Sequence, residues 1–326
     1  MDEAALRRLP KAELHCHLDG IADPPMLREL AARGCTLPLS AEELERAYPV
    51  HDFDSFTRWF AAIRPLEGTI EQFKPLLQVH LERLKAQGVV YAELMVAGSE
   101  LPRDASQAVE MMAAFRKWLT VQEGGEIQVE VLSAISRART PEQMAARTDI
   151  YLTLFHAGLL AGFAIAGPEV GYPIAAHART LARVREAGMP VEIHAGEWAG
   201  PESVWDALTH GQPARIGHGV AIFQDQRLLE TVLERGLHVE MCPTSNVTFG
   251  SLCRQIEQHP IRHALDLGLS LSVNTDDPGA SGATMLSEYA LLAAQFGFDE
   301  GDFRRLFSHT LAARFVRRLR GRAASV

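Results

Sequence analysis

The sequence has few cysteines, no long apolar run and no export signal. Its four cysteines lie at spacings typical of neither a disulfide framework nor a zinc-finger pair. No stretch approaches the ~20 consecutive apolar residues that a transmembrane helix needs, and the acidic N-terminus lacks the apolar core of a signal peptide. We therefore expect free thiols in a cytoplasmic protein that does not enter a membrane.

Basic residues are outnumbered, because 32 Lys and Arg stand against 41 Asp and Glu and give a net charge of −9. The one basic cluster is Arg317-Arg318-Leu319-Arg320-Gly321-Arg322. A solvated helix end explains this run better than a nucleic-acid surface does. The composition thus argues against a polynucleotide partner and leaves small substrates open.

The pattern of apolar residues predicts eight strands, each followed by a helix. With 326 residues and 47% hydrophobic content, the chain is long enough for one large α/β domain. Alternation of strands and helices indicates parallel pairing, and eight units indicate a closed (β/α)8 TIM barrel. The predicted strands are Ala12–Leu18, Val89–Val96, Ile127–Ile135, Gly162–Ala166, Pro190–His194, Arg215–Val220, His238–Cys242 and Leu269–Asn274.

The first two predicted strands are separated by a long helical stretch, at about residues 21–88. We interpret it as a helical lid over the barrel mouth, so that residues 1–326 form a single domain. Phe53, Phe56, Trp59 and Phe60 recur there at helical spacing. Such a cluster packs in a core or forms the wall of an aromatic ligand's site.

Polar residues gather at the predicted strand ends, where TIM barrels carry their chemistry. His15 and His17 are two residues apart on a strand, so both side chains face the same way. Together with His194 and Asp276 they offer three nitrogens and one oxygen, a set that suits one Zn²⁺ per chain. Alone, each histidine is equally explained as a buried hydrogen-bonding residue.

Three further residues at these ends are candidates for proton transfer or substrate contact. His218, between two glycines, could take or orient a proton of the attacking water. Glu197, in a dry pocket, would stay protonated and serve as an acid. Asp277 could contact the substrate or cap the helix that begins at Pro278. The alternatives are a packing histidine for His218 and a surface ion pair for Glu197, while Cys16 should be a buried bystander.

Five motifs in order resemble the adenosine deaminase family of the amidohydrolase superfamily, from about residue 10 to about residue 315. They are Leu14-His15-Cys16-His17-Leu18-Asp19-Gly20, His194-Ala195-Gly196-Glu197, Arg215-Ile216-Gly217-His218-Gly219, Cys242-Pro243-Thr244-Ser245-Asn246 and Val273-Asn274-Thr275-Asp276-Asp277-Pro278.

The resemblance implies a role for each candidate. His15, His17, His194 and Asp276 hold the zinc ion, and His218 and Asp276 activate the water that attacks C6 of a 6-aminopurine while Glu197 protonates N1. On the substrate side, Asp277 contacts N7, the Gly167 N–H contacts N3, and Asp19 meets the 5′-hydroxyl of the ribose. The metal ligand His17 also faces the substrate, and Phe53 and Phe56 belong to the flap over the base.

Two positions depart from the family pattern. Met95 stands where the family usually has Arg, and Pro168 stands where many members have Asp. Both should face the barrel mouth, so they bear on which group the sugar carries at its 5′ side.

The expected reaction converts adenosine or 2′-deoxyadenosine to the inosine and ammonia. The alternative is a 5′-substituted adenosine such as 6-aminodeoxyfutalosine, a menaquinone precursor. Adenine ranks third, because relatives acting on it look more like Glu at position 19. A two-metal ester or lactone hydrolase would need a bridging Lys, and a zinc-bearing binding protein would lack the acid.

Overall fold

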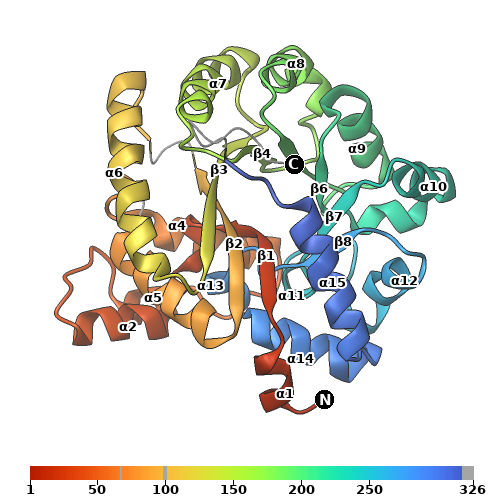
Figure 1. The fold of residues 1–326 in the computed structure, drawn as a ribbon, viewed down its shortest axis with the longest axis horizontal. Helices are drawn as coiled ribbons and strands as arrows, with labels where there is room; N and C mark the ends of the chain where they lie inside the picture. Colours follow the sequence, from red (N-terminus) through yellow and green to blue (C-terminus); the bar gives the residue numbers. More distant parts are fainter. Residues whose placement is uncertain (67, 98–100, 318–326) are drawn as a thin grey trace.

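The computed structural model describes residues 1–66, 68–97 and 101–317, and its centre is a barrel of eight parallel strands (Figure 1). The strands pair in sequence order from β1 to β8. The predicted TIM barrel is therefore confirmed. The strands are β1 Lys11–His17, β2 Val89–Ala97, β3 Gln128–Ser136, β4 Gly162–Ala166, β5 Val191–Ala195, β6 Arg215–His218, β7 His238–Met241 and β8 Leu271–Val273.

The first and last strands meet just after the end of β8. A parallel bridge joins Cys16 to Asp276. The His17 N–H donates to the Asp276 carbonyl at 2.9 Å, and the Asp276 N–H donates to the His15 carbonyl at 3.0 Å. Since these bonds flank the bridge, they fix the backbone of Asp276 directly beside that of the two β1 histidines.

Helices surround the strands and follow one another around the barrel in sequence order (Figure 1). Many begin at a polar residue that caps the first turn, such as Thr140 before α7 and Asp299 before α15. The principal outer helices are α6 Ala105–Glu123, α7 Pro141–His156, α8 Ala178–Glu186, α9 Pro201–Asp206, α10 Gln226–Glu234, α12 Ile261–Asp266, α14 Met285–Phe296 and α15 Glu300–Ala313, with α1 Glu3–Arg8 preceding β1.

The segment between β1 and β2 is helical in the part that the structure describes. Its helix α4 begins at a reciprocal cap, in which the Asp52 carboxylate accepts the Ser55 N–H at 2.7 Å and the Ser55 hydroxyl accepts the Asp52 N–H at 3.0 Å. The elements of this segment are η1 Asp19–Ile21, α2 Pro24–Ala32, α3 Ala41–Glu45, α4 Phe53–Ile63, η2 Arg64–Leu66 and α5 Lys74–Ala86.

The floor of the barrel contains a buried ion network. The Arg215 guanidinium lies 2.6 Å from a carboxylate oxygen of Glu93 and 2.5 Å from one of Glu240. The Phe315 ring packs against that guanidinium, with its centroid 3.5 Å from Cζ, and the Phe315 N–H donates to Glu93 at 2.7 Å. The chain after α15 therefore covers the end of the barrel opposite the carboxyl ends of the strands. Each buried charge of this network has a partner of opposite charge, which offsets the cost of its burial.

Two local expectations needed correction. The helix expected after the fifth strand is α-helical only over Pro201–Asp206 and becomes π-helical over Ala207–Gly211. The basic run does not continue α15, which ends at Ala313, and Arg317 lies 2.7 Å from Glu130. The rest of that run is outside the described residues.

The four cysteines are free thiols, and Cys16 is fully buried, as expected. In the described part of the chain, none of the helices combines the length and apolar character that crossing a bilayer requires. The cytoplasmic location stays a prediction.

Candidate active site

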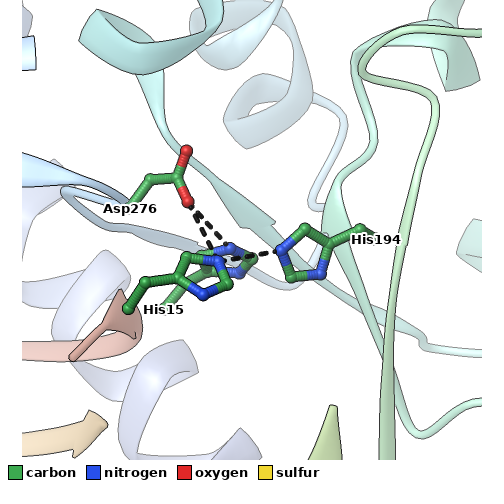
Figure 2. A group of neighbouring side chains, drawn as sticks. His15, His194 and Asp276 are labelled. Carbon is green, nitrogen blue, oxygen red and sulfur yellow. Dashed lines mark hydrogen bonds and ion pairs between the residues drawn. The ribbon is translucent and has the colours of Figure 1, made fainter. Parts of the chain in front are cut away.

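Four side chains from distant parts of the chain meet at the carboxyl end of the barrel (Figure 2). His15 and His17 come from β1, His194 from β5 and Asp276 from the segment after β8. Nε2 of His17 lies 3.1 Å from Nε2 of His194. Asp276 Oδ1 lies 3.3 Å from Nε2 of both His15 and His17. The structure thus brings together the four expected ligands, and that they bind a metal stays a prediction.

The donor set fits a zinc ion. One ligand atom from each of the four residues lies within 4.8 Å of the others. Nε2 of His15 is buried and makes no regular hydrogen bond with a described residue, although Asp276 Oδ1 lies 3.3 Å from it. Buried polar nitrogens are rarely left unpaired, so this atom is suited to a cation. A Cβ on Gly217 would lie 2.9 Å from the His15 ring, which explains the glycine there.

Carboxylates hold the second nitrogen of two of these histidines. Nδ1 of His15 lies 2.8 Å from Glu240, and Nδ1 of His194 lies 3.0 Å from Glu192. Both glutamates are fully buried. Such a partner fixes the ring orientation and directs Nε2 toward the metal position.

Glu197 and His218 lie next to the cluster. Oε2 of Glu197 lies 3.5 Å from Nε2 of His218, and both side chains are buried. Burial raises the pKa of the Glu197 carboxyl well above its usual range, and the charges of Asp276 and Glu169 raise it further. A carboxyl group in this state can donate a proton near neutral pH.

The backbone that carries Glu197 is held by a second glutamate. The carboxylate of Glu169 accepts the N–H groups of Gly196, Glu197 and Trp198, at 2.7, 2.8 and 2.8 Å. On the other side of the site, the Asn246 amide connects His218 Nδ1, at 3.0 Å, with His259 Nε2, at 3.2 Å. These contacts position the acid and its neighbouring histidine.

Two site residues have an unusual backbone conformation. His218 has a φ of 62° and Asp276 a φ of 63°. Residues other than glycine adopt this left-handed region at a cost of the order of ~1 kcal/mol, and such residues cluster at functional sites. His218 is the last residue of β6 and Asp276 follows the end of β8, and both residues line the cavity at the mouth of the barrel.

One large cavity of about 1170 Å³ extends outward from the cluster. Asp277 lies in the cavity wall. Burial raises the pKa of its carboxyl group well above the usual range, and the charge of Asp276 raises it further. It occupies the position before the short helix α13 Pro278–Ser281, but its side chain makes no capping hydrogen bond. All six residues expected on the substrate side line the cavity, namely His17, Asp19, Phe53, Phe56, Gly167 and Asp277.

This geometry agrees with the comparison to known families. The adenosine deaminase family model matches residues 10–323. The chain belongs to the adenosine deaminase family. Enzymes of this family are hydrolytic deaminases of the amidohydrolase superfamily and depend on a metal, for which the four-residue cluster is the candidate here.

Individual relatives cover nearly the whole chain. An adenine deaminase from Sinorhizobium fredii is 34% identical over 311 residues, which is 94% of both proteins. A crystal structure of an adenine deaminase from Arthrobacter aurescens has a TM-score of 0.80, 26% identity and 94% coverage of both chains. An amidohydrolase from Burkhoderia ambifaria, solved with bound zinc, has a TM-score of 0.79, 25% identity and coverage of 96% of this chain and 88% of that one.

The two departures from the adenosine deaminase pattern occupy different places. Pro168 lines the cavity, as expected. Met95 does not line it, because its side chain is fully buried inside the barrel with Leu132, Ala134 and Phe315. The expectation that Met95 faces the mouth is therefore wrong: the strand continues to Ala97, and Ala97 reaches the cavity instead.

Sequence reasoning missed the residues that support the site. It assigned no role to Glu169, Glu192, Glu240 or Asn246, nor to Ser245, whose hydroxyl donates to Asp276 Oδ2 at 2.6 Å. A signal was present for two of them. Glu192 and Glu240 are carboxylates within short, fully buried strands, and such charges need a partner.

Proposed function

We propose that the protein is a zinc-dependent aminohydrolase that converts a 6-aminopurine nucleoside, adenosine or 2′-deoxyadenosine, to the 6-oxopurine nucleoside and ammonia. One observation carries the proposal: three histidines and an aspartate converge beside the buried acid Glu197 at the inner end of one cavity. Among the described residues, one further candidate metal-binding group lies entirely in the lining of this cavity, and that group, Glu197, His218 and Asp276, belongs to the same site.

The chain's own residues account for each proton that moves. Zinc held by His15, His17, His194 and Asp276 would supply Lewis acidity that activates water. His218 and Asp276 take and orient the proton of that water as it adds to C6 of the purine. Glu197 gives its proton to the ring nitrogen N1, so that C6 becomes tetrahedral without a build-up of charge on the ring. The proton taken from the water then passes to the 6-amino group, which leaves as ammonia, while the proton of the C6 hydroxyl returns to Glu197 and the 6-oxopurine forms.

The remaining cavity residues would hold the base and sugar. Asp277 faces N7, the N–H of Gly167 faces N3, and Asp19 meets the 5′ side of the sugar. Gly167 has a φ of 90°, and a Cβ there would lie 2.5 Å from the Ser136 hydroxyl. Only glycine therefore allows the backbone to approach at this point.

The helical segment at about 21–88 would act as the lid of this single domain. Phe53 and Phe56 of α4 line the same cavity as the metal-binding cluster. Closing an apolar surface over the base excludes water and strengthens the polar interactions beneath it.

Adenine is the second candidate substrate, because the relative from Sinorhizobium fredii and the solved structure from Arthrobacter aurescens are both adenine deaminases. Asp19 and the size of the cavity favour a larger substrate. A 5′-substituted adenosine such as 6-aminodeoxyfutalosine satisfies both observations as well.

Substitution of the proposed acid tests the chemistry. Glu197→Gln keeps the shape but has no proton to give, so kcat should fall about 1000-fold while zinc content is unchanged. Glu257→Gln, the same change at an exposed position outside the cavity, should retain normal turnover. Turnover is followed by the ultraviolet change on loss of the amine. Normal activity of Glu197→Gln would show that another group is the acid.

A substrate panel tests the specificity. Adenine, adenosine, 2′-deoxyadenosine and 6-aminodeoxyfutalosine are compared by kcat/KM in the zinc-loaded protein. The proposal expects a nucleoside to rank above adenine. It fails in its chemistry if none of the panel loses its amine.

A further inference from the structure

The lining of the cavity is divided by charge. Its acidic residues, Asp19, Glu197, Asp276 and Asp277, follow β1, β5 and β8 and surround the metal-binding cluster. Its basic residues apart from histidine are four arginines, none of them near those strand ends in sequence. They are Arg64 in η2, Arg103 between β2 and α6, Arg139 between β3 and α7, and Arg147 in α7.

Three of these arginines have no partner in the described part of the chain. The guanidinium groups of Arg64, Arg103 and Arg139 make no hydrogen bond or ion pair with a described residue, and all three residues are exposed to solvent. The fourth, Arg147, donates to the carbonyls of Leu101 and Pro102, both at 3.1 Å. Arg147 thereby ties α7 to the loop that carries Arg103.

The protein carries a net charge of −9, yet the charged residues that line the cavity away from the metal-binding cluster are all arginines. Elsewhere some surface arginines pair with a carboxylate, as Arg28 does with Glu45 and Arg183 with Asp149, and others, such as Arg179 and Arg227, make no ion pair with a described residue. Unpaired guanidinium groups around a cavity attract anions and bind carboxylate or phosphate through two parallel hydrogen bonds.

We infer that Arg64, Arg103 and Arg139 form a subsite for an anionic group of the substrate, at the end remote from the amino group. The inference rests on the proposed function and narrows its substrate class to a 6-aminopurine nucleoside bearing a carboxylate or phosphate at the 5′ side. The apolar lining at the ends of β2, β3 and β4, from Ala97, Ile135 and Ala166, accommodates the part that joins the sugar to the anion.

The cavity volume supports a substrate of this size. About 1170 Å³ is at the upper limit of sites that hold drug-sized ligands, and a free purine base would fill only a small part of it.

Kinetics with matched substrates test the subsite. Adenosine, adenosine 5′-carboxylate and AMP share the base and sugar and differ in the 5′ group. The double variant Arg103→Gln/Arg139→Gln is compared with Arg179→Gln/Arg227→Gln, which removes two exposed arginines of α8 and α10 outside the cavity. All three proteins are assayed zinc-loaded at low and high ionic strength.

We expect the wild type to prefer one anionic substrate to adenosine by at least about tenfold in kcat/KM, and the preferred one identifies the anion. The cavity double variant should lose about 100-fold on it and less than threefold on adenosine. The surface double variant should match the wild type. High salt should reduce the preference in the wild type and in the surface double variant, but not in the cavity double variant. Equal losses on adenosine and the anions, or a wild-type preference for adenosine, would overturn the subsite.

Binding measurements separate this inference from the proposed function. AMP and adenosine 5′-carboxylate are titrated calorimetrically into Glu197→Gln with and without the two cavity substitutions. If adenosine is deaminated but neither anion depends on the arginines, the subsite is wrong and the deaminase proposal stands. If no substrate is deaminated but the anions bind in an arginine-dependent way, the proposed function fails and the subsite stands.

Discussion

At the residue scale, the candidate site depends on carboxylates that do not line the cavity. Glu192 and Glu240 hold Nδ1 of His194 and His15, so each ring presents Nε2 to the cluster. Glu240 is in turn neutralised by Arg215, whereas no arginine or lysine side chain lies within 4 Å of Glu192 among the described residues. Burial accordingly raises the pKa of Glu192 to about 7.

Replacing Glu192 isolates this positioning role. Glu192→Gln keeps the shape but weakens the hold on His194 and lowers the basicity of its ring. We expect zinc affinity to fall about tenfold or more, measured by competition with a chromophoric chelator.

Glu288→Gln provides the matched control. Glu288 is equally buried, burial also raises its pKa to about 7, and its carboxylate accepts the Thr244 N–H without touching a candidate ligand. It should change thermal stability as Glu192→Gln does but leave zinc affinity within threefold. Equal zinc affinities in the two variants would exclude the positioning role of Glu192.

These supports were harder to infer from the sequence than the candidate ligands. His15, His194 and Asp276 stand at strand ends beside turn residues, which is a local pattern. The partnership of His15 with Glu240 joins β1 to β7 across the barrel and depends on strand register, which no local pattern encodes. The left-handed backbone of His218 and Asp276 could not be predicted from the sequence either. Glycine usually marks this conformation, and neither residue is a glycine.

At the scale of elements, helix α4 contacts the site through stacked rings. Phe56 stacks on Phe249, after α11 Pro243–Thr248, with centroids 4.5 Å apart and an interplanar angle of 18°. Phe53 meets Trp198, after β5, edge to face at 4.6 Å. The proposed lid is thus attached to two of the loops that carry site residues.

Truncation of the stacked ring tests the lid. Phe56→Ala removes the contact with Phe249 and opens the cavity wall, so kcat/KM should fall about tenfold, mainly through KM, in steady-state assays. Phe223→Ala removes a ring of similar burial from η6 Val220–Gln224, outside the cavity. If both variants lose the same activity, general destabilisation and not lid contact is responsible.

Strands and helices differed in how well the sequence located them. Strands β1 to β8 were predicted because short β-branched runs between Gly and Pro are distinctive. The end of β6 was placed two residues late, at Val220, because the positive φ of His218 ends the strand before its apolar residues do. The π-helical turn after α9 has no sequence signal of its own.

At the scale of the whole molecule, folding buries histidines in neutral form. Burial lowers the pKa of His80 to about 4 and that of His259 to about 3, against about 6.5 in the unfolded chain. The unfolded state therefore binds more protons below pH 6.5. The free energy of unfolding should fall as the pH drops through the window from about 6.5 to about 4.

Between pH 7 and pH 5, each of these two histidines should lower the free energy of unfolding by about 2 kcal/mol. Urea unfolding of the metal-free protein at these two pH values measures the loss. In His80→Gln the loss should be smaller by about that amount, and the exposed His51→Gln should behave like the wild type. An unchanged loss in His80→Gln would mean that His80 is protonated in the folded protein.

Phe315 makes the two ends of the barrel differ in how well they tolerate changes to the chain. The Phe315 backbone is hydrogen-bonded to the side chains of Glu93 and Tyr91, and the Phe315 ring fills the space that a side chain at position 162 would need. Insertions in the loops above can reshape specificity while the scaffold persists. A truncation or a fused domain that displaces Phe315 would instead admit solvent to the ion pairs of Arg215. Because Glu240 pairs with Arg215 and also holds Nδ1 of His15, the change would alter the position of His15 from the opposite end of the barrel.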